Sequence, residues 1–356
     1  MPTNINQGNS ALRLSVVIPV YNVTDYIEKC VRSLQAQDIP KEAFELIIIN
    51  DGSPDNSKEV VLGLMNEFNN IVFIDQVNKG VSMARNAGIE MARGQYLLFI
   101  DPDDYVVQDS FCRILKTADQ YQAEICFLGY RFLNEGNTVR KEILFEQEKG
   151  KLFKGTEMYA ISRVDGSTDP DKSVAILFNR EFMNGNGIRY IANIPYLEDG
   201  ELLGRVLCLA QRCIFEGNPF YIRTTRPGSA TNSTLFNTEK AIIGFVTAAV
   251  NLKNFNKIHD LNQNQKDFIN QPIAKFTLLA VQSCGDSLAW KFLLMIRKSF
   301  HSSGLKKLSL TGILYPYTIY ARIYNGSIFL FYGYWIYKRM VTSVILKGSK
   351  LSSRKK

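Results

Sequence analysis

The sequence predicts an α/β protein with a mainly parallel central sheet flanked by helices, followed by a mainly helical C-terminal region. Three observations lead to this prediction. Short apolar runs alternate with helical patterns over residues 14–110, which is typical of strand–helix–strand units and a parallel sheet. Two of these runs, residues 45–50 and 95–100, are followed at once by aspartates. From about residue 240 the chain has the character of successive helices.

Residues 14–20 are expected to form the first strand, and a helix follows them. Asp25 and Glu28 have the spacing of a capping box, so we expect the helix to begin there. Its buried face is predicted from apolar residues that recur at i, i+3, i+4 and i+7. These residues are Ile27, Cys30, Val31 and Leu34.

The second strand is expected at residues 45–50, again with a helix after it. Ser53 and Pro54 predict an N-cap and a first-turn proline for this helix. Its apolar face consists of Val60, Val61, Leu64 and Phe68. The segment from the second strand to this helix therefore forms the next strand–helix unit.

A third strand is predicted at residues 71–74 and a third helix at residues 81–93, which Gly94 closes. The fourth strand is expected at residues 95–100. These elements complete the alternating pattern of a parallel sheet. Much later in the chain, a further helix is expected around residues 201–210.

Three carboxylates, those of Asp101, Asp103 and Asp104, follow the fourth strand directly. In an open parallel sheet, the carboxyl ends of the strands line the ligand crevice. Carboxylates this close together repel one another unless a cation lies between them, and hard divalent cations prefer oxygen ligands. The alternative is a charged turn that caps a helix beginning at Tyr105. The buried strand before the acids favours a metal and nucleotide site.

Other polar residues also follow predicted strands. Asp51 could accept a hydrogen bond from a base or a ribose hydroxyl, or it could cap the next helix through an Asx-turn. The loop at residues 19–22 contains no glycine, so it is neither a dinucleotide-binding turn nor a P-loop. Tyr21 could pack beside a base, or simply belong to a strand-to-helix turn. Residues 78–88 open a helix whose N-terminus favours anions, and Arg85 there could reach a phosphate or lie on the surface.

Five motifs follow one another along the first third of the chain: SVVIPVYN at residues 15–22, NDGS at 50–53, NKG at 78–80, ARN at 84–86 and DPDD at 101–104. Their order resembles the family 2 glycosyltransferases, enzymes of the GT-A fold that are typical of bacterial polysaccharide synthesis. The resemblance covers roughly residues 14–110. It implies a nucleotide-sugar donor, with UDP as the expected carrier, a divalent metal (Mn²⁺ or Mg²⁺) and inversion at the anomeric carbon.

The resemblance also assigns roles to single residues. Donor contacts fall to Pro19, Tyr21, Asp51, Arg85 and Asp101. Among these, Asp51 is the expected contact to the base, and Asp101 opens the DxD pair. Asp103 closes that pair and is the expected direct metal ligand, while Asp104 is a supporting acid.

A thinner resemblance continues into the second half of the chain. Residues 196–200 are similar to the acidic motif that supplies the family's general base, which makes Asp199 the expected base and Glu198 its neighbour. The alternative is that Asp199 caps the following helix, and it could do both. Residues 221–229 resemble a segment that ends the catalytic region, where Arg226 could meet the diphosphate.

The expected organisation follows from the resemblance. Residues 1–235 form a GT-A domain, with a nucleotide-sugar-binding half at residues 14–110 and an acceptor-side half at residues 111–235. Within the latter, residues 130–170 are polar and predict a hairpin or loops. Residues 236–356 form a helical, basic and aromatic C-terminal region that we expect to associate with a membrane.

We expect the C-terminal region to associate with a membrane because of its charge and its aromatic residues. No acidic residue follows Asp286, and thirteen Lys and Arg residues lie from Lys291 to the end; with a net charge of +8 for the whole chain, the rest carries −5. Its longest apolar run, residues 328–337, is too short to span a bilayer. Aromatic residues interleaved with basic ones suit an anionic membrane surface. The alternative is an amphipathic helix that packs on the protein's own core.

The sequence thus predicts an inverting transferase that moves a sugar from a UDP-sugar to a hydroxyl of a glycan or lipid-linked acceptor in cell-surface polysaccharide synthesis. We expect it in the cytoplasm, peripheral to the inner face of the cell membrane and without a nucleic-acid partner. The first residues lack the pattern of a signal peptide, and the six cysteines form no CxxC pair. The alternatives are a sugar-1-phosphate nucleotidyltransferase, which ordinarily needs a glycine-rich phosphate loop, and a non-catalytic membrane-surface scaffold or nucleic-acid binder, which leaves the acid-ended strands unexplained.

Overall fold

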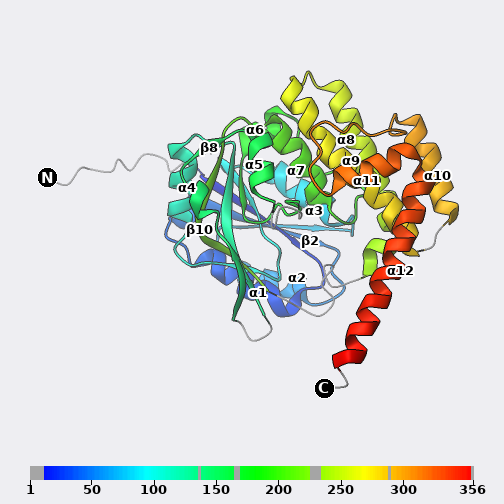
Figure 1. Cartoon of the computed structure of the whole chain (residues 1–356). Helices are drawn as coiled ribbons and strands as arrows, with labels where there is room; N and C mark the ends of the chain where they lie inside the picture. The colour runs from blue at the N-terminus through cyan, green and yellow to red at the C-terminus, as the bar shows by residue number, and fades with distance from the viewer. Residues whose placement is uncertain (1–11, 135–137, 164–168, 225–233, 288–289, 354–356) are drawn as a thin grey trace. The chain divides into compact units, whose positions relative to one another are not determined.

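Figure 1 shows a computed structural model of the chain, which describes residues 12–134, 138–163, 169–224, 234–287 and 290–353. The chain forms two compact units. The first comprises Met1–Ser162, Pro170–Ala192 and Leu209–Ser229. The second comprises Arg163–Asp169, Asn193–Cys208 and Ala230–Lys356. The second unit therefore includes two short segments that precede residue 235 as well as the C-terminal helices. The division of the chain into a GT-A domain up to residue 235 and a C-terminal region after it stays a prediction.

The first unit is built on a ten-stranded sheet with the strand order β3-β2-β1-β4-β9-β6-β10-β5 among the described residues. Its first half consists of β1 (Leu14–Val20), β2 (Phe44–Asp51), β3 (Ile71–Gln76) and β4 (Tyr96–Phe99). Neighbouring strands in this half all pair in parallel. Every residue of β1, β2 and β4 is buried, as expected for strands covered on both faces. The four predicted strands are therefore confirmed.

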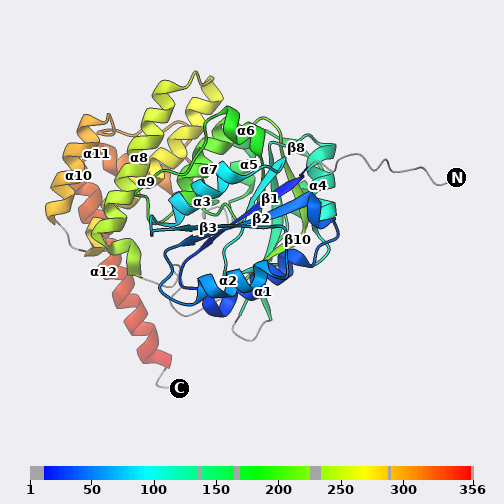
Figure 2. The same cartoon turned by 180° about the vertical axis from the view of Figure 1, so that it is seen from behind.

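Helices cover both faces of this half-sheet (Figure 2): α1 (Thr24–Gln35) and α2 (Ser57–Met65) lie on one face and α3 (Val81–Met91) on the other. Alternate residues of a strand point to opposite faces. Val16 and Ile18 join one core with α1 and α2. Val17 points to α3, where a Cβ on Gly88 would lie 2.3 Å from Val17 Cγ1. The predicted apolar face of α1 is fully buried, which confirms it.

The predicted capping box of α1 is wrong. The N-cap position is Val23, and the side chain of that residue caps nothing. Asp55, which lies just before α2, takes this part: its Oδ2 accepts hydrogen bonds from Thr24 N (2.9 Å) and Thr24 Oγ1 (2.6 Å). Burial alone would raise the pKa of Asp55, but hydrogen bonds from Ser57 and Thr24 lower it to about 2. A carboxylate from another element thus replaces the local Asp25–Glu28 pair.

Two other predicted helix ends are also displaced. The second helix begins at Ser57 with Asn56 at its N-cap, not at Ser53 and Pro54. Ser53 instead bonds the end of β1, because its Oγ donates to Val20 O (3.3 Å). The third helix ends at Met91, before the residues that lead to Gly94. The hydrophobic period located these helices correctly, whereas the polar residues at their ends make longer-range bonds.

The second half of the sheet is mixed. Its strands are β5 (Tyr105–Val106), β6 (Ile125–Leu133), β7 (Val139–Ile143), β8 (Leu152–Phe153), β9 (Ile176–Asn179) and β10 (Cys213–Arg223). β9 runs antiparallel to both β4 and β6, and β10 runs parallel to β6. β6 and β7 form the predicted hairpin. The helices of this half are α4 (Phe111–Gln120), α5 (Gly155–Ile161) and α6 (Arg180–Gly185).

The second unit is helical, as predicted. It contains α7 (Glu198–Leu209, all but its last residue), α8 (Glu239–Ile258), α9 (Gln263–Ser287), α10 (Trp290–Ser302), α11 (Tyr317–Gly326) and α12 (Ile328–Ser353). α7 packs closely on α8 and α9, since a Cβ on Gly204 would lie 3.2 Å from Pro272 and 3.3 Å from Leu252. Within the described ranges, no helix combines the length and apolar character that a bilayer crossing needs.

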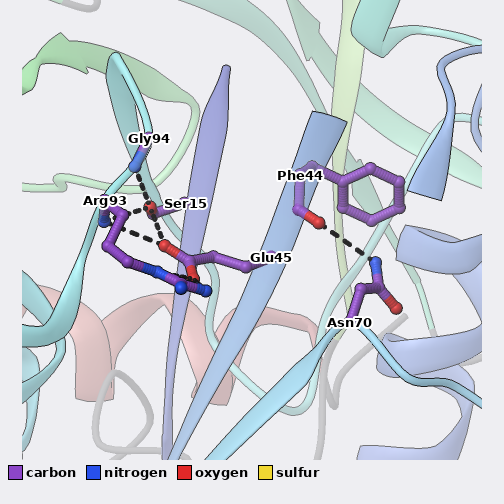
Figure 3. A network of polar contacts seen from close by, with 6 residues as sticks. All are labelled: Ser15, Phe44, Glu45, Asn70, Arg93 and Gly94. Carbon is purple, nitrogen blue, oxygen red and sulfur yellow. Dashed lines mark hydrogen bonds and ion pairs between the residues drawn. The ribbon is translucent and has the colours of Figure 1, made fainter. Parts of the chain in front are cut away.

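A polar network joins β1 and β2 to the connection between α3 and β4 (Figure 3). Ser15 Oγ donates to Glu45 Oε1 (2.7 Å), and Gly94 N donates to Ser15 Oγ (2.8 Å). Arg93 closes the network, with Nη2 2.7 Å from Glu45 Oε2 and its backbone N 2.9 Å from Glu45 Oε1. Beside it, Asn70 Nδ2 donates to Phe44 O (3.3 Å). The connection from α3 to β4 is therefore bonded to the N-terminal ends of β1 and β2.

This network requires glycine at position 94. A Cβ there would lie 2.5 Å from Ser15 N and 2.6 Å from Leu14 C, so Gly94→Ala should lower the unfolding free energy by roughly 1–3 kcal/mol, the usual cost of overpacking. Gly63→Ala is the matched control: its Cβ would meet nothing within 4 Å in α2, and alanine favours a helix by about 0.5–1 kcal/mol. Urea unfolding followed by circular dichroism compares them. Equal stability of the two variants would refute this role for Gly94.

Candidate active site

Three carboxylates converge just beyond the end of β4. Oxygens of Asp101, Asp103 and Asp104 all lie within 4.8 Å of one another, and only Asp104 of the three is buried. The alternative of a helix cap at Tyr105 is wrong, because Tyr105 begins the short strand β5. The structure thus brings together the three acids that the sequence singled out.

The end of β10 fixes the geometry of this acid cluster. Tyr221 OH donates to Asp104 Oδ2 (2.6 Å) and accepts from Asp101 N (3.3 Å). Thr224 donates its backbone N to Asp104 Oδ1 (2.7 Å) and its Oγ1 to Asp103 O (2.6 Å). Both oxygens of Asp104 are therefore engaged in positioning the loop. Sequence reasoning missed Tyr221 and Thr224, since nothing local in residues 101–104 signals a strand more than a hundred positions away.

The acids of the cluster also destabilise one another's charged forms. Burial, followed by the charges of Asp101 and Asp103, raises the pKa of Asp104 to about 7. A bound cation would relieve both effects because it adds positive charge where negative charge is confined. Carboxylate oxygens are the donors that Mg²⁺ and Mn²⁺ prefer. The donor set therefore fits the metal that the sequence predicts.

Arg85 approaches the cluster from α3. It is only 3% exposed, so the alternative of a surface arginine is wrong. Its Nη2 donates to Asp101 Oδ1 (3.0 Å), and its guanidinium lies 5.3 Å from the ring centre of Tyr190. The next residue, Asn86, holds that tyrosine through its backbone, donating to Tyr190 O (2.9 Å) and accepting from Tyr190 N (2.8 Å). Arg85 thus contacts both Asp101 and Tyr190, and Asn86 fixes the backbone of Tyr190.

Asp51 lies at the end of β2 and is buried. Its Oδ1 accepts from Lys79 N (2.8 Å) and from Gln76 Nε2 (2.7 Å), and its Oδ2 accepts from Gly80 N (2.8 Å). Asp51 therefore holds the loop that precedes α3. The alternative, an Asx-turn that caps α2, is wrong. Gly80 has φ 84°, a left-handed conformation that favours glycine. Contact of Asp51 with a base stays a prediction.

The two residues assigned to the first nucleotide loop differ in exposure. Pro19 is a buried residue of β1 and pairs with Ile49 of β2. Tyr21 follows the strand and leaves 49% of its surface exposed. Asn22 then adopts a left-handed φ of 55°, and its N donates to Ser53 Oγ (3.3 Å). The ring of Tyr21 is thus available to a ligand, whereas Pro19 shapes the strand end.

Two cations that the sequence did not single out lie near the acid cluster. Lys172 Nζ lies 4.7 Å from the ring centre of Phe132, and the guanidinium of Arg223 lies 5.6 Å from the same ring. Burial and the charge of Arg223 lower the pKa of Lys172 to about 8, while Asp101 and Asp104 act in the opposite direction. Lys172 comes from an irregular segment, so no periodic pattern could have marked it.

The predicted base belongs to the second unit. Helix α7 begins at Glu198, so Asp199 lies in its first turn and is 8% exposed. The alternative of Asp199 as the N-cap is therefore wrong, although a carboxylate in a first turn interacts favourably with the helix dipole. α7 is fixed by a buried pair that sequence reasoning missed: Arg205 Nη2 lies 2.6 Å from Glu201 Oε2, and Asn251 Nδ2 donates to Glu201 Oε1 (2.6 Å).

Arg226, the residue predicted to meet the diphosphate, lies outside the residues that the structure describes. Of the predicted site residues in the first unit, the three acids lie together at the end of β4, and Arg85 donates a hydrogen bond to Asp101. Asp51 and Tyr21 follow the ends of the neighbouring strands β2 and β1. These positions match the carboxyl edge of the parallel sheet, where ligands bind in such folds.

Comparison with known proteins agrees with this arrangement. The uncharacterized glycosyltransferase EpsJ of Bacillus subtilis is 31% identical over 61% of this chain and 62% of its own length. The poly(ribitol-phosphate) β-glucosyltransferase of Bacillus spizizenii is 36% identical over 53% of this chain and 28% of its own length. The chain thus spans less than two thirds of both curated relatives. The crystal structure of Staphylococcus aureus TarS 1–349 with UDP-GlcNAc has a TM-score of 0.62 at 20% identity, covering 90% of this chain and 89% of that one.

The likeness to TarS shows the GT-A fold, with a mixed α/β sheet, flanking helices and a helical C-terminal region. The model of the family described as glycosyl transferase family 2 matches residues 15–168, which include the acid cluster, Asp51 and Arg85. The resemblance that the five motifs carry is thereby confirmed. Residues 15–168 form a domain of glycosyltransferase family 2.

Proposed function

We propose that this protein transfers a sugar from a UDP-sugar, with inversion, to a hydroxyl of a glycan or lipid-linked acceptor in cell-surface polysaccharide synthesis. The acid cluster at the end of β4, inside a family 2 domain, carries this proposal. Two likenesses support the donor and the process. TarS was crystallised with UDP-GlcNAc, and the Bacillus spizizenii relative is named as a glucosyltransferase of poly(ribitol phosphate).

Donor binding is proposed to use the carboxyl edge of the parallel half. Asp51 accepts from the base, with Pro19 and the exposed ring of Tyr21 beside it. Asp101 and Arg85 lie on the side of the diphosphate, and Asp103 is the metal ligand. A divalent cation held by Asp103 would supply positive charge next to the leaving diphosphate. Asp104 keeps the loop in place through Tyr221 and Thr224.

Proton transfer is proposed to use Asp199, with Glu198 as its neighbour. As the acceptor oxygen attacks the anomeric carbon, the hydroxyl proton passes to the Asp199 carboxylate, a new C–O bond forms, and the bond to the diphosphate breaks on the opposite face. The anomeric configuration therefore inverts. Arg226 is the proposed cationic partner of the departing diphosphate. Glu201 and Arg205 hold α7, and hence Asp199, in place within the second unit.

Association with an anionic membrane surface is proposed for α10–α12. These helices pack through buried residues such as Phe300, Ala321 and Phe331, so the packing alternative holds for part of their surface. They also leave large apolar side chains exposed: Trp290, Leu294, Met295, Ile319, Leu330, Tyr337 and Met340. Exposed apolar groups among basic ones fit the interface of an anionic leaflet. A lipid-linked acceptor would then lie on the cytoplasmic face.

Substitution of the base tests the proposed reaction. Asp199→Asn should lower kcat for UDP release from UDP-GlcNAc with Mn²⁺ by about 10²–10⁴, the usual contribution of a positioned general base. Asp260→Asn, an exposed residue of the same unit, is the matched control and should retain the rate. Donor affinity, measured by calorimetry, should stay the same in both. Loss of donor affinity in parallel with kcat would show that Asp199 is not the base.

Vesicle sedimentation of the full-length protein tests the membrane proposal. Leu330→Gln with Tyr337→Gln removes two side chains that are 63% and 64% exposed, and should reduce co-sedimentation with phosphatidylglycerol vesicles. Val77→Gln with Ile258→Gln is the control, since these side chains are 75% and 77% exposed elsewhere. High salt should weaken but not abolish binding, because basic residues contribute at most about 1 kcal/mol each. Absence of binding at low salt would contradict the proposal.

A further inference from the structure

A cavity of about 250 Å³ lies in the second unit, where α10 approaches the junction of α11 and α12. Four basic side chains line it: Arg297, His301, Lys306 and Lys307. Its volume is just below the range of about 300–1,000 Å³ that holds drug-sized ligands, which suits a smaller group. The cavity shares no residue with the proposed donor site, and binding in it is independent of the proposed transfer reaction.

The positive charge of this cavity is not compensated. Within the part of the chain that the structure describes, none of the four basic side chains forms an ion pair with a carboxylate. The sequence around them offers no partner either, since no acidic residue follows Asp286. The guanidinium of Arg297 and the ammonium groups of Lys306 and Lys307 are like charges in a concave surface, so they raise the local potential for an anion. The cavity therefore favours a negatively charged occupant.

The lysines of this cavity are held by a fixed loop. Tyr324 OH, from α11, donates to Leu305 O (2.7 Å). Asn325 accepts from Leu308 N (2.7 Å) and donates to Leu308 O (2.8 Å) through its side-chain amide. Lys306 and Lys307 lie between these two anchored positions. One buried tyrosine and one asparagine side chain thus fix the placement of two adjacent cations.

Other residues of the cavity lining also have defined contacts. The guanidinium of Arg297 lies 5.4 Å from the ring centre of Phe329, within the range of a cation–π contact. Ser327 precedes α12, and its Oγ accepts from Phe329 N (3.2 Å). The N-terminus of this 26-residue helix adds a partial positive charge at the cavity. Guanidinium and ammonium donors that converge in this way are the usual partners of phosphate oxygens.

We infer that this cavity binds the phosphate group of a phosphate ester, either in a lipid headgroup or in a soluble polyol phosphate. The phosphate oxygens accept hydrogen bonds from Arg297, Lys306 and Lys307, and the aromatic wall of Phe329 packs against the organic part. Both sources present the same phosphate chemistry, so the experiment distinguishes them by the form in which the ester is supplied.

The test compares two double variants of equal charge in the full chain. Lys306→Gln with Lys307→Gln should weaken binding of sn-glycerol 3-phosphate by at least about tenfold, because two charge-assisted hydrogen bonds are lost. Lys291→Gln with Lys298→Gln removes the same charge from exposed sites of α10 outside the cavity, and should change the affinity less than about twofold. Calorimetry gives the affinities, and thermal unfolding verifies the fold.

Gly326→Leu is a second variant that changes no charge. A Cβ at this lining residue would lie 3.7 Å from Leu330 Cδ1, an ordinary contact, so the longer side chain should fill the cavity without unfolding the helix. It should weaken glycerol 3-phosphate binding as strongly as the cavity double variant. The same variants are then sedimented with phosphatidylcholine vesicles that contain phosphatidic acid.

Each outcome has a distinct meaning. A difference between the two double variants with both glycerol 3-phosphate and vesicles supports a site open to any phosphate ester. A difference with vesicles alone supports a lipid headgroup, and a difference with glycerol 3-phosphate alone supports a soluble ester. Equal losses for the two double variants would show only the field of a basic surface and would overturn the inference, as would wild-type protein that binds neither probe.

Discussion

The candidate active site of the first unit depends on keeping three carboxylates together at the end of one buried strand. Asp101, Asp103 and Asp104 repel one another there, and burial, followed by the charges of Asp101 and Asp103, raises the pKa of Asp104. Such a loop persists only when the surrounding structure holds it. β10 supplies this support through Tyr221, whose hydroxyl joins the backbone at Asp101 to the carboxylate of Asp104.

The rest of the parallel half delivers this loop and its neighbours to one edge. The network of Ser15, Glu45 and Gly94 ties the α3–β4 connection to β1 and β2 at the opposite ends of the strands. From there β4 runs buried to the acids, while α3 brings Arg85 to Asp101 on the same edge. The network at one end of the strands and the acid cluster at the other thus depend on the same packing of β1, β2, β4 and α3. A Cβ at Gly94 should therefore disturb this packing.

The sequence predicted elements better than it predicted their ends. Buried strands and the apolar face of α1 follow from local periodicity, which a single chain displays directly. Asp25 and Glu28 do not form the predicted box because Asp55, thirty positions away, bonds the first turn instead. Likewise Tyr221 and Lys172 reach the acid cluster only through tertiary structure. Local patterns predict the fold and the three acids. The residues that position those acids belong to the second half of the sheet, which local patterns do not connect to them.

The most direct experiment asks whether Asp103 holds a cation that in turn holds UDP. Thermal unfolding of the wild-type protein should show a stabilisation by UDP that requires Mn²⁺, which at 100 times the dissociation constant amounts to about 2.7 kcal/mol. Asp103→Asn should abolish it, while Asp109→Asn, an exposed aspartate in a nearby turn, should preserve it. Metal-dependent stabilisation by UDP that persists in Asp103→Asn would contradict the proposed donor site.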